Sequence, residues 1–292
     1  MKSILITGVN GFLGSNLAYK LSKNYKIIGL EHPSTCSNKL PIDTLKYYYY
    51  NEGIQKDIFI ENEIFAVLHA ATVYGRGNSV LDNLLHTNIL LPVSIYELAN
   101  KYNTKLFLNT DTFFNNEKRN YEYLENYTLS KKHALDWLRL IRDKCKIVNM
   151  KIFHMYGPND SPSKFIPQMI NLMIKNKKQI ELTAGEQKRD FIYIDDVVRA
   201  YEIVLSNYEK IAENYKEYQL GTGVSITIKE LISFIKKASK SKSKLIFGAL
   251  PYRKNEIMDS IANNEELIRL GWQSTFSVQK GIKEILNSIN KK

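Results

Sequence analysis

A glycine-rich turn near the N-terminus constrains the fold of this chain more than any other feature. The run Thr7-Gly8-Val9-Asn10-Gly11-Phe12-Leu13-Gly14 follows a short apolar segment, Ser3–Thr7, and opens a stretch with helical character. Its glycines let the backbone turn tightly and bring N–H groups against a pyrophosphate, which the positive end of the following helix dipole also attracts. The spacing is one residue wider at its start than the dinucleotide fingerprint of larger dehydrogenases. Its position between a strand and a helix still predicts a dinucleotide-binding turn.

Short apolar runs alternate with longer amphipathic segments through the first half of the chain, a pattern typical of β-α-β units on a parallel sheet. We expect strands at Ser3–Thr7, Lys26–Leu30, Tyr47–Tyr50, Ala66–Ala71, Lys105–Thr110 and Ile147–Phe153. We expect helices that begin near Gly11, Ile54, Asn83 and Tyr123, and a short strand followed by a helix capped by Asp195 within Gln187–Leu205. Further helices are expected at Pro167–Asn176, at Ile228–Ser239 and near Glu265 and Lys280.

No internal repeat, low-complexity linker or Pro/Gly-rich hinge separates two independent domains. We therefore predict an α/β fold in which a doubly wound parallel sheet is joined to a smaller C-terminal substrate lobe. We assign residues 1–156 with 187–222 to the dinucleotide-binding domain, and residues 157–186 with 223–292 to the lobe.

The charge and the cysteine content favour some classes of protein over others. The formal charge of +11 is compatible with nucleic-acid binding. The densest basic groups, Lys175–Lys178 and Lys236–Lys244, adjoin apolar helical stretches, so we favour scattered surface lysines whose field suits an anionic nucleotide. The two cysteines, Cys36 and Cys145, have neither disulfide nor metal-ligand spacing, which predicts a reducing compartment and no metal site.

No apolar stretch approaches the ~18–20 residues that a membrane helix needs. We expect a cytoplasmic protein that binds neither membranes nor nucleic acid.

An acidic residue, Glu31, follows the second predicted strand. A carboxylate at this place can accept hydrogen bonds from the adenosine ribose and repel a 2′-phosphate, which favours NAD over NADP. His32 and Lys39 nearby could still accommodate the phosphate, and Glu31 could also be a solvated loop residue. The choice between NAD and NADP therefore stays open.

Tyr127 and Lys131 lie four residues apart on a predicted helix, and hence on one face of it. This pair suits hydride transfer, because the phenol can exchange a proton with a substrate oxygen while the ammonium favours the phenolate and holds the nicotinamide ribose. Thr110 ends the preceding strand at the edge of the sheet where ligands bind, and its hydroxyl could bridge the reacting oxygen to Tyr127.

These motifs occur together with His69-Ala70-Ala71, Tyr156-Gly157-Pro158, Arg189-Asp190-Phe191, Asp195-Asp196 and Gly221-Thr222-Gly223. In this order they resemble the NAD-dependent epimerase/dehydratase family, the extended branch of the short-chain dehydrogenases/reductases. The resemblance covers essentially the whole chain. It implies a Rossmann-type domain that binds NAD or NADP, a C-terminal lobe, a nucleotide-diphospho-sugar substrate and a homodimer.

The resemblance also implies roles for particular residues. The catalytic group would be Thr110, Tyr127 and Lys131. Cofactor contacts would come from Tyr127 and Lys131 and from residues of the glycine-rich turn and the strand ends, namely Gly8, Asn10, Gly11, Phe12, Leu13, Gly14, Glu31, His32, Ala70, Ala71 and Asn88. Substrate contacts would come from Tyr74, Arg76, Asp111, Thr112, His154, Arg189, Arg253 and Glu256. Arginine forks suit phosphate oxygens, although Arg253 could equally be surface charge and His154 a packing residue.

Departures from the family pattern narrow the activity. Thr112 follows Asp111 where the 4,6-dehydratases have Asp-Glu, so their base is missing, and neither cysteine is placed as in the branch that epimerises GDP-sugars. The run Thr110-Asp111-Thr112-Phe113-Phe114 resembles the 4-ketohexose reductases. The loop Val73–Asn78, His154 and the run Leu182–Asp190 resemble the CDP-abequose and CDP-paratose synthase group.

The resemblance thus implies NAD(P)H-dependent reduction of the C4 keto group of a nucleotide-linked 4-keto-6-deoxyhexose. A CDP-sugar is favoured, with dTDP- or GDP-sugars possible, in the biosynthesis of O-antigen lipopolysaccharide and other surface polysaccharides. A 4-epimerase, which uses the same triad, is the alternative. A non-enzymatic binder on this fold is disfavoured by the complete triad. Self-association is expected from apolar residues on more than one helix face, namely Ala134, Leu135, Trp137, Leu138, Leu140 and Ile141.

Overall fold

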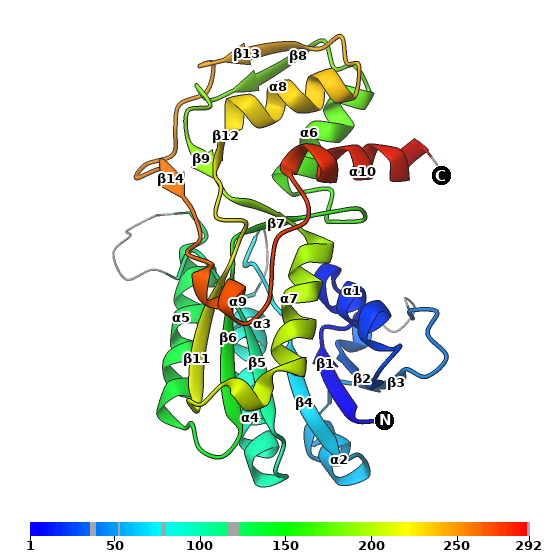
Figure 1. The fold of residues 1–292 in the computed structure, drawn as a ribbon. Coiled ribbons are helices and arrows are strands. Elements are labelled where there is room, and N and C mark those ends of the chain that lie inside the picture. Colours follow the sequence, from blue (N-terminus) through cyan, green and yellow to red (C-terminus); the bar gives the residue numbers. More distant parts are fainter. Residues whose placement is uncertain (36–38, 52, 77–79, 116–122, 291–292) are drawn as a thin grey trace. The chain divides into compact units, whose positions relative to one another are not determined.

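The computed structural model describes residues 1–35, 39–51, 53–76, 80–115 and 123–290. Its centre is a seven-stranded sheet with the order β11-β6-β5-β4-β1-β2-β3 (Figure 1). From the central strand β1 the chain moves outward to β2 and β3 on one side, and then returns to β4, β5 and β6 on the other. Each strand from β3 through β2, β1 and β4 to β5 pairs in parallel with its neighbour in the sheet. This is the predicted doubly wound α/β fold, and its topological switch point lies between β1 and β4.

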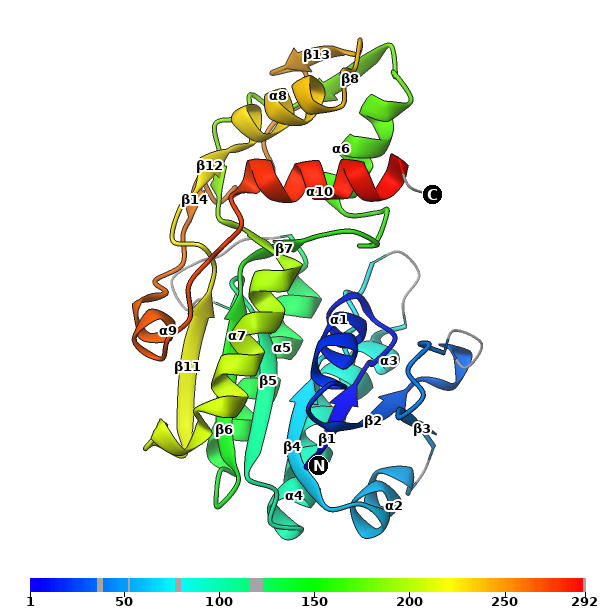
Figure 2. The same cartoon turned by 45° about the vertical axis from the view of Figure 1, so that its right-hand side comes forward.

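The strands of this sheet are β1 (Ser3–Thr7), β2 (Lys26–Glu31), β3 (Lys46–Tyr49), β4 (Ile64–His69), β5 (Leu106–Thr112), β6 (Lys146–Ile152) and β11 (Tyr215–Leu220). The helices around it are α1 (Phe12–Leu21), α2 (Ile54–Glu61), α3 (Leu81–Leu85), α4 (Leu91–Lys101), α5 (Glu125–Leu140) and α7 (Ile194–Ser206). A π-helical turn, η2 (His86–Leu90), joins α3 to α4. Helices α1 and α7 lie on one face of the sheet, and α4 and α5 lie on the other (Figure 2).

The six predicted strands are confirmed, each within two residues at either end. The central strands form because helices cover both faces of the sheet, which lets continuous apolar runs bury themselves. In β1, for example, Ile4, Leu5 and Ile6 are all fully buried. Strand β11 was missed, because Tyr215–Leu220 mixes charged and apolar residues and is only half-buried.

The remaining strands form smaller sheets. They are β7 (His154–Tyr156), paired with β10 (Phe191–Tyr193); β9 (Lys188–Arg189), paired with β12 (Ile226–Thr227) and β14 (Asp259–Ser260); and β8 (Gln179–Leu182), paired with β13 (Lys244–Phe247). The helices here are α6 (Phe165–Ile174), α8 (Ile228–Ala238), α9 (Glu265–Arg269) and α10 (Val278–Asn290). Helix α7 begins at Ile194, so the prediction that Asp195 caps it is wrong: Asp195 lies inside the first turn.

The chain divides into two compact units, one of residues 1–119, 124–151 and 198–218, and the other of residues 120–123, 152–197 and 219–292. The predicted division placed residues 152–156, 187–197 and 219–222 with the dinucleotide-binding domain. In the structure they fall in the second unit, where β7, β9 and β10 pair outside the seven-stranded sheet. The functional assignment of the two units stays a prediction.

Among the residues that the structure describes, no helix has both the length and the apolar character to span a membrane. Within the same residues, no cluster of His, Cys, Asp and Glu side chains could hold a metal ion. Cys145 is buried and unpaired, and Cys36 lies outside the described residues.

Candidate active site

The glycine-rich turn follows β1 and is closed by contacts that leave no room for side chains. Gly8 has a positive φ of 63°, and a Cβ there would lie 2.7 Å from the Cα of Ala71. A Cβ on Gly14 would lie 2.1 Å from the carbonyl oxygen of Gly8. The Gly8 N–H donates to Leu30 at 2.8 Å, which ties the turn to the carboxyl end of β2. The turn therefore requires glycine at position 8 because of the positive φ and the contact with Ala71, and at position 14 because a Cβ would clash with the Gly8 carbonyl.

The carboxylate of Glu31 lies against this turn. One oxygen accepts the Asn10 N–H at 2.8 Å, and the other accepts the His32 N–H at 3.0 Å. The hydroxyl of Tyr47 donates to the Asn10 side chain at 2.9 Å, and the Lys39 ammonium lies 5.8 Å from the Tyr47 ring centroid. The structure thus brings the predicted ribose acceptor, Glu31, to the turn at the carboxyl end of β2.

These residues fit a dinucleotide. Helix α1 begins at Phe12, and its N-cap residue, Gly11, makes no side-chain cap hydrogen bond to the first turn. The Ala71 N–H donates to the Thr7 hydroxyl at 3.2 Å, so the end of β4 forms a second wall beside Gly8. Backbone N–H groups at the positive end of a helix and a close backbone approach are what a pyrophosphate needs. The individual cofactor contacts stay predictions.

Helix α5 carries Tyr127 and Lys131 one turn apart, and both are almost fully buried. The hydroxyls of Thr112 and Thr72 hydrogen-bond the Tyr127 phenol. Burial raises the pKa of Tyr127 well above its usual value, the nearby charges add to this, and the two hydroxyls oppose it. Tyr127 is therefore held as a protonated phenol in this structure.

The hydroxyl of Thr110 lies 2.7 Å from that of Tyr201, a fully buried residue of α7. The hydrogen bond to Tyr127 comes instead from Thr112, two residues further along β5. Contact of Thr110 with the reacting oxygen stays a prediction. The end of β5 therefore does reach the Tyr127 phenol of α5, but through Thr112 and not through Thr110.

Burial lowers the pKa of Lys131 to about 8, and the charge of Asp111 opposes this fall. The Asp111 carboxylate accepts from the Thr112 N–H at 2.8 Å, from Asn149 at 2.9 Å and from Asn115 at 3.1 Å. Burial raises the pKa of Asp111, and these donors work against the rise. Asp111 was predicted to contact substrate, and the structure places it among protein donors with 3% of its surface exposed.

Asn88 lies in η2 and is fully buried. Its amide nitrogen donates to the Val73 carbonyl at 2.8 Å and to the Ser130 hydroxyl at 2.9 Å. Its amide oxygen accepts from the Val73 N–H at 2.8 Å and from Thr72 at 3.3 Å. Since these bonds use both amide hydrogens, Asn88 acts on the site by holding the segment after β4 against α5.

That segment brings two predicted substrate residues to the catalytic pair. The ring centroids of Tyr74 and Tyr127 are 4.9 Å apart, and the Arg76 guanidinium lies 5.3 Å from the Tyr74 ring centroid. The next residues of this loop, Gly77 and Asn78, lie outside the described residues.

The second unit gathers the other predicted substrate residues. Arg189 forms an ion pair with Glu256, and its guanidinium also donates to the backbone carbonyls of Lys188 and Ile257. Burial and the charge of Arg189 lower the pKa of His154 to about 3, so this imidazole is neutral at physiological pH.

The His154 ring lies 3.3 Å from the Ser260 hydroxyl. Arg253 stacks on Tyr123, with the guanidinium carbon 3.8 Å from the ring centroid.

Two motif aspartates tie segments of the second unit together. The Asp190 carboxylate accepts from the N–H and hydroxyl of Thr222 and from the N–H groups of Gly223 and Ala262. The Asp196 carboxylate accepts from residues 274–276, and its carbonyl accepts the indole N–H of Trp272. These motif residues are structural: they connect β9–β10 and α7 to distant loops.

Sequence reasoning missed Thr72, Tyr201 and Asn149 as members of the site. Thr72 and Tyr201 carry no local signal, because their contacts come from distant segments. Asn149 does carry one, since it interrupts the apolar run of β6, KIVNMKI, where a polar side chain needs a buried partner.

The chain is similar to several characterised proteins. The model of the NAD dependent epimerase/dehydratase family matches residues 4–221. The CDP-abequose synthase of Salmonella muenchen is 39% identical over 98% of this chain and 97% of its own, and that of Salmonella typhimurium is 33% identical over 98% of both. The crystal structure of Thermotoga maritima UDP-glucose 4-epimerase with UDP-glucose matches with a TM-score of 0.84, at 23% identity over 99% of both chains. The chain belongs to the NAD-dependent epimerase/dehydratase family, as its motifs predicted.

Proposed function

We propose that this protein is an NAD(P)H-dependent reductase that acts on the C4 keto group of a nucleotide-linked 4-keto-6-deoxyhexose. The observation that carries the proposal is the buried Tyr127–Lys131 pair of α5, hydrogen-bonded at the phenol by Thr112 and Thr72 at the carboxyl end of the sheet. The two similar CDP-abequose synthases support both the reaction class and a CDP-linked substrate.

The residues of this chain can manage the proton that ketone reduction requires. When bound, the reduced nicotinamide supplies hydride to the sugar carbonyl carbon. Tyr127, kept protonated by burial, donates its proton to the developing alkoxide. Thr112 stabilises the resulting phenolate by donating a hydrogen bond to it, and the Lys131 ammonium does so by its charge. Thr110 is proposed to bond the same substrate oxygen once its hydroxyl turns from Tyr201.

The finer assignments belong to the same proposal. Glu31 at the glycine-rich turn favours NAD over NADP. In the second unit we propose that Arg189, Arg253, Glu256 and His154 contact the nucleotide part of the substrate. We also propose a cytoplasmic enzyme that serves surface-polysaccharide biosynthesis, with dTDP- and GDP-sugars as less favoured substrates.

A 4-epimerase is the second reading, and the position of Glu31 favours it. An epimerase oxidises and then re-reduces the same sugar, so it retains its cofactor, and a retained NAD suits that cycle. Net consumption of reduced cofactor separates the two.

The apolar surface of α5 supports a homodimer. Leu129, Trp137 and Leu140 are 53%, 52% and 73% exposed on this helix, while Ala134, Leu135 and Leu138 are buried. We expect sedimentation to show a dimer that Trp137→Lys with Leu140→Lys converts to a monomer. The control is Ile289→Lys on α10, where an equally apolar side chain is 42% exposed. A wild-type monomer, or equal loss in the control, would contradict the proposal.

The reductase proposal is tested by mixing the protein with CDP- or dTDP-4-keto-6-deoxyglucose and following NADH or NADPH absorbance. We expect one reduced cofactor to be consumed per CDP-sugar, faster than with the dTDP-sugar. Tyr127→Phe should reduce kcat by about 10²–10⁴-fold because it removes the proton donor. Tyr208→Phe, at a partly exposed tyrosine whose hydroxyl is bonded to Glu209, should keep wild-type kcat. Absence of consumption with both sugars and both cofactors would end the assignment.

A further inference from the structure

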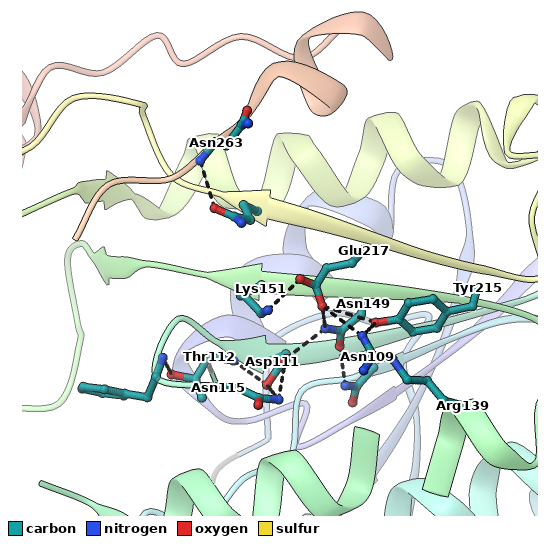
Figure 3. A network of polar contacts seen from close by, with 12 residues as sticks. Asn109, Asp111, Thr112, Asn115, Arg139, Asn149, Lys151, Tyr215, Glu217 and Asn263 are labelled. Atoms are coloured by element: carbon teal, nitrogen blue, oxygen red, sulfur yellow. Dashed lines mark hydrogen bonds and ion pairs between the residues drawn. The ribbon is translucent and has the colours of Figure 1, made fainter. Parts of the chain in front are cut away.

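A row of polar side chains crosses three adjacent strands on one face of the seven-stranded sheet (Figure 3). Asp111 lies on β5, Asn149 on β6 and Glu217 on β11. The amide nitrogen of Asn149 donates to Asp111 at 2.9 Å and to Glu217 at 2.9 Å. One buried amide therefore joins the two carboxylates.

The orientation of this amide follows from its neighbours. The side-chain nitrogen of Asn109 donates to the Asn149 oxygen at 2.7 Å. The opposite orientation would set the Asn149 oxygen against two carboxylates, which only accept hydrogen bonds. Asn149 is fully buried, so water cannot replace either bond without entering the sheet. Both hydrogens of its NH₂ group are therefore committed to the carboxylates.

Positively charged side chains act on both carboxylates. Glu217 accepts from the Lys151 ammonium at 2.6 Å, and the Arg139 guanidinium lies 3.8 Å away. These cations and Asn149 lower the pKa of Glu217 against the effect of burial. Asp111 interacts with the Lys131 ammonium. The negative charge of Asp111 raises the pKa of Lys131, against the larger lowering by burial. The row of polar side chains thus has Tyr127 and Lys131 at one end and the ion cluster around Glu217 at the other.

We propose that Asn149 is a positioning residue of the active site: its amide holds the Asp111 carboxylate ionised at the end of β5, beside Tyr127 and Lys131. This inference rests on the proposed function for its catalytic meaning. An ionised Asp111 keeps the Lys131 ammonium charged and the Tyr127 phenol protonated, because a nearby negative charge favours both protonated forms. Asn149 touches neither substrate nor cofactor in this scheme and acts only through Asp111.

Several ionisable groups surround Asp111 and must be considered in its titration. They are Tyr127 and Lys131 on α5, Lys151 on β6, Tyr215 and Glu217 on β11, and Tyr201 on α7. Of these, Lys131 and Lys151 favour the carboxylate form of Asp111 through their charges.

The test is a ¹³C NMR titration of the Asp111 carboxyl carbon in the NAD-saturated enzyme, assigned with Asp111→Asn. In Asn149→Leu, which replaces the amide by an apolar group of similar size, we expect the pKa of Asp111 to rise by about one to two units. Asn149→Ala gives the same measurement if the leucine variant does not fold. The matched control is Glu217→Gln, which keeps an acceptor for Asn149. It should lower the thermal unfolding temperature while the pKa of Asp111 stays unchanged or falls.

The kinetic readout is a double-variant cycle. Asn149→Leu should reduce kcat about tenfold in the wild-type background and have no further effect in Asp111→Asn, because its action passes through Asp111. An unchanged Asp111 pKa in both Asn149 variants, or additive losses of kcat, would overturn the inference. The titration needs no sugar substrate, so a failed reductase assignment would leave this result separately readable.

Discussion

Burial, more than neighbouring charge, sets the chemistry of the Tyr127–Lys131 pair. It is the largest influence on both groups, raising the pKa of the phenol and lowering that of the ammonium to about 8. The spacing of four residues was enough to predict that the two share a helix face. The partners of the phenol were not predictable, because the turn of Thr110 toward Tyr201 and of Thr112 toward Tyr127 depends on α7 and on the end of β5.

Cofactor affinity should therefore depend on pH through Lys131. The ammonium is charged below pH of about 8 and neutral above it, so a hydrogen bond to the nicotinamide ribose loses its charge as the pH rises. We expect the Kd for NADH, measured by fluorescence titration, to increase about tenfold between pH 7 and 9.5. Lys131→Met should give a weak affinity that does not vary over this range. A wild-type Kd that is flat across pH 8 would show that Lys131 does not hold the cofactor by its charge.

Among the proposed substrate residues, the sequence pattern identified Arg189 and Glu256 individually but not their ion pair. They are 67 positions apart and have no pattern in common. The pairing changes the interpretation of Arg189, because part of its guanidinium is already used by Glu256 and by two carbonyl groups. A phosphate would meet an arginine that is positioned by the protein beforehand.

At the level of elements, local pattern was most informative where backbone geometry leaves few choices. The turn between β1 and α1 could be predicted because its geometry accepts only glycine at two positions. Gly8 has a positive φ, and Gly14 lies against the carbonyl oxygen of Gly8. Strands β9, β12 and β14 have two residues each, too few for any period, and no local pattern could predict them. Their pairing is a tertiary effect, to which Asp190 contributes by joining three chain segments.

Two alanine substitutions in the glycine-rich turn should therefore differ in cost. Gly14→Ala would drive a methyl group into the Gly8 carbonyl, and we expect a loss of about 2–3 kcal/mol in the free energy of unfolding, with much weaker NADH binding. Gly11 has an ordinary φ of −69°, and a Cβ there would lie 3.1 Å from the same oxygen. Gly11→Ala should cost about 1 kcal/mol or less. Urea unfolding of both variants gives the comparison, and equal costs would contradict the described turn.

At the scale of the whole molecule, the doubly wound fold class and the family were accessible from sequence, and the boundaries between the two units were not. The doubly wound sheet follows from alternating strands and helices in the first half of the chain. The division falls inside α7 and β11, so no linker marks it in the sequence. Contacts between distant segments decide to which unit each part of α7 belongs. The buried carboxylate of Asp196 binds residues 274–276 to the first turn of α7, although these segments are nearly 80 positions apart.

In the proposed reaction the whole protein transfers one hydride from a dissociable cofactor to C4 of a keto-sugar nucleotide. The most direct measurement supplies NADH deuterated at the transferred position together with CDP-4-keto-6-deoxyglucose, and locates the label by mass spectrometry and NMR. We expect one deuterium at C4 of the product for each NAD⁺ formed, and none with Tyr127→Phe over the same time. An altered sugar that carries no deuterium, with no NAD⁺ released, would contradict this reaction and identify an enzyme that retains its cofactor.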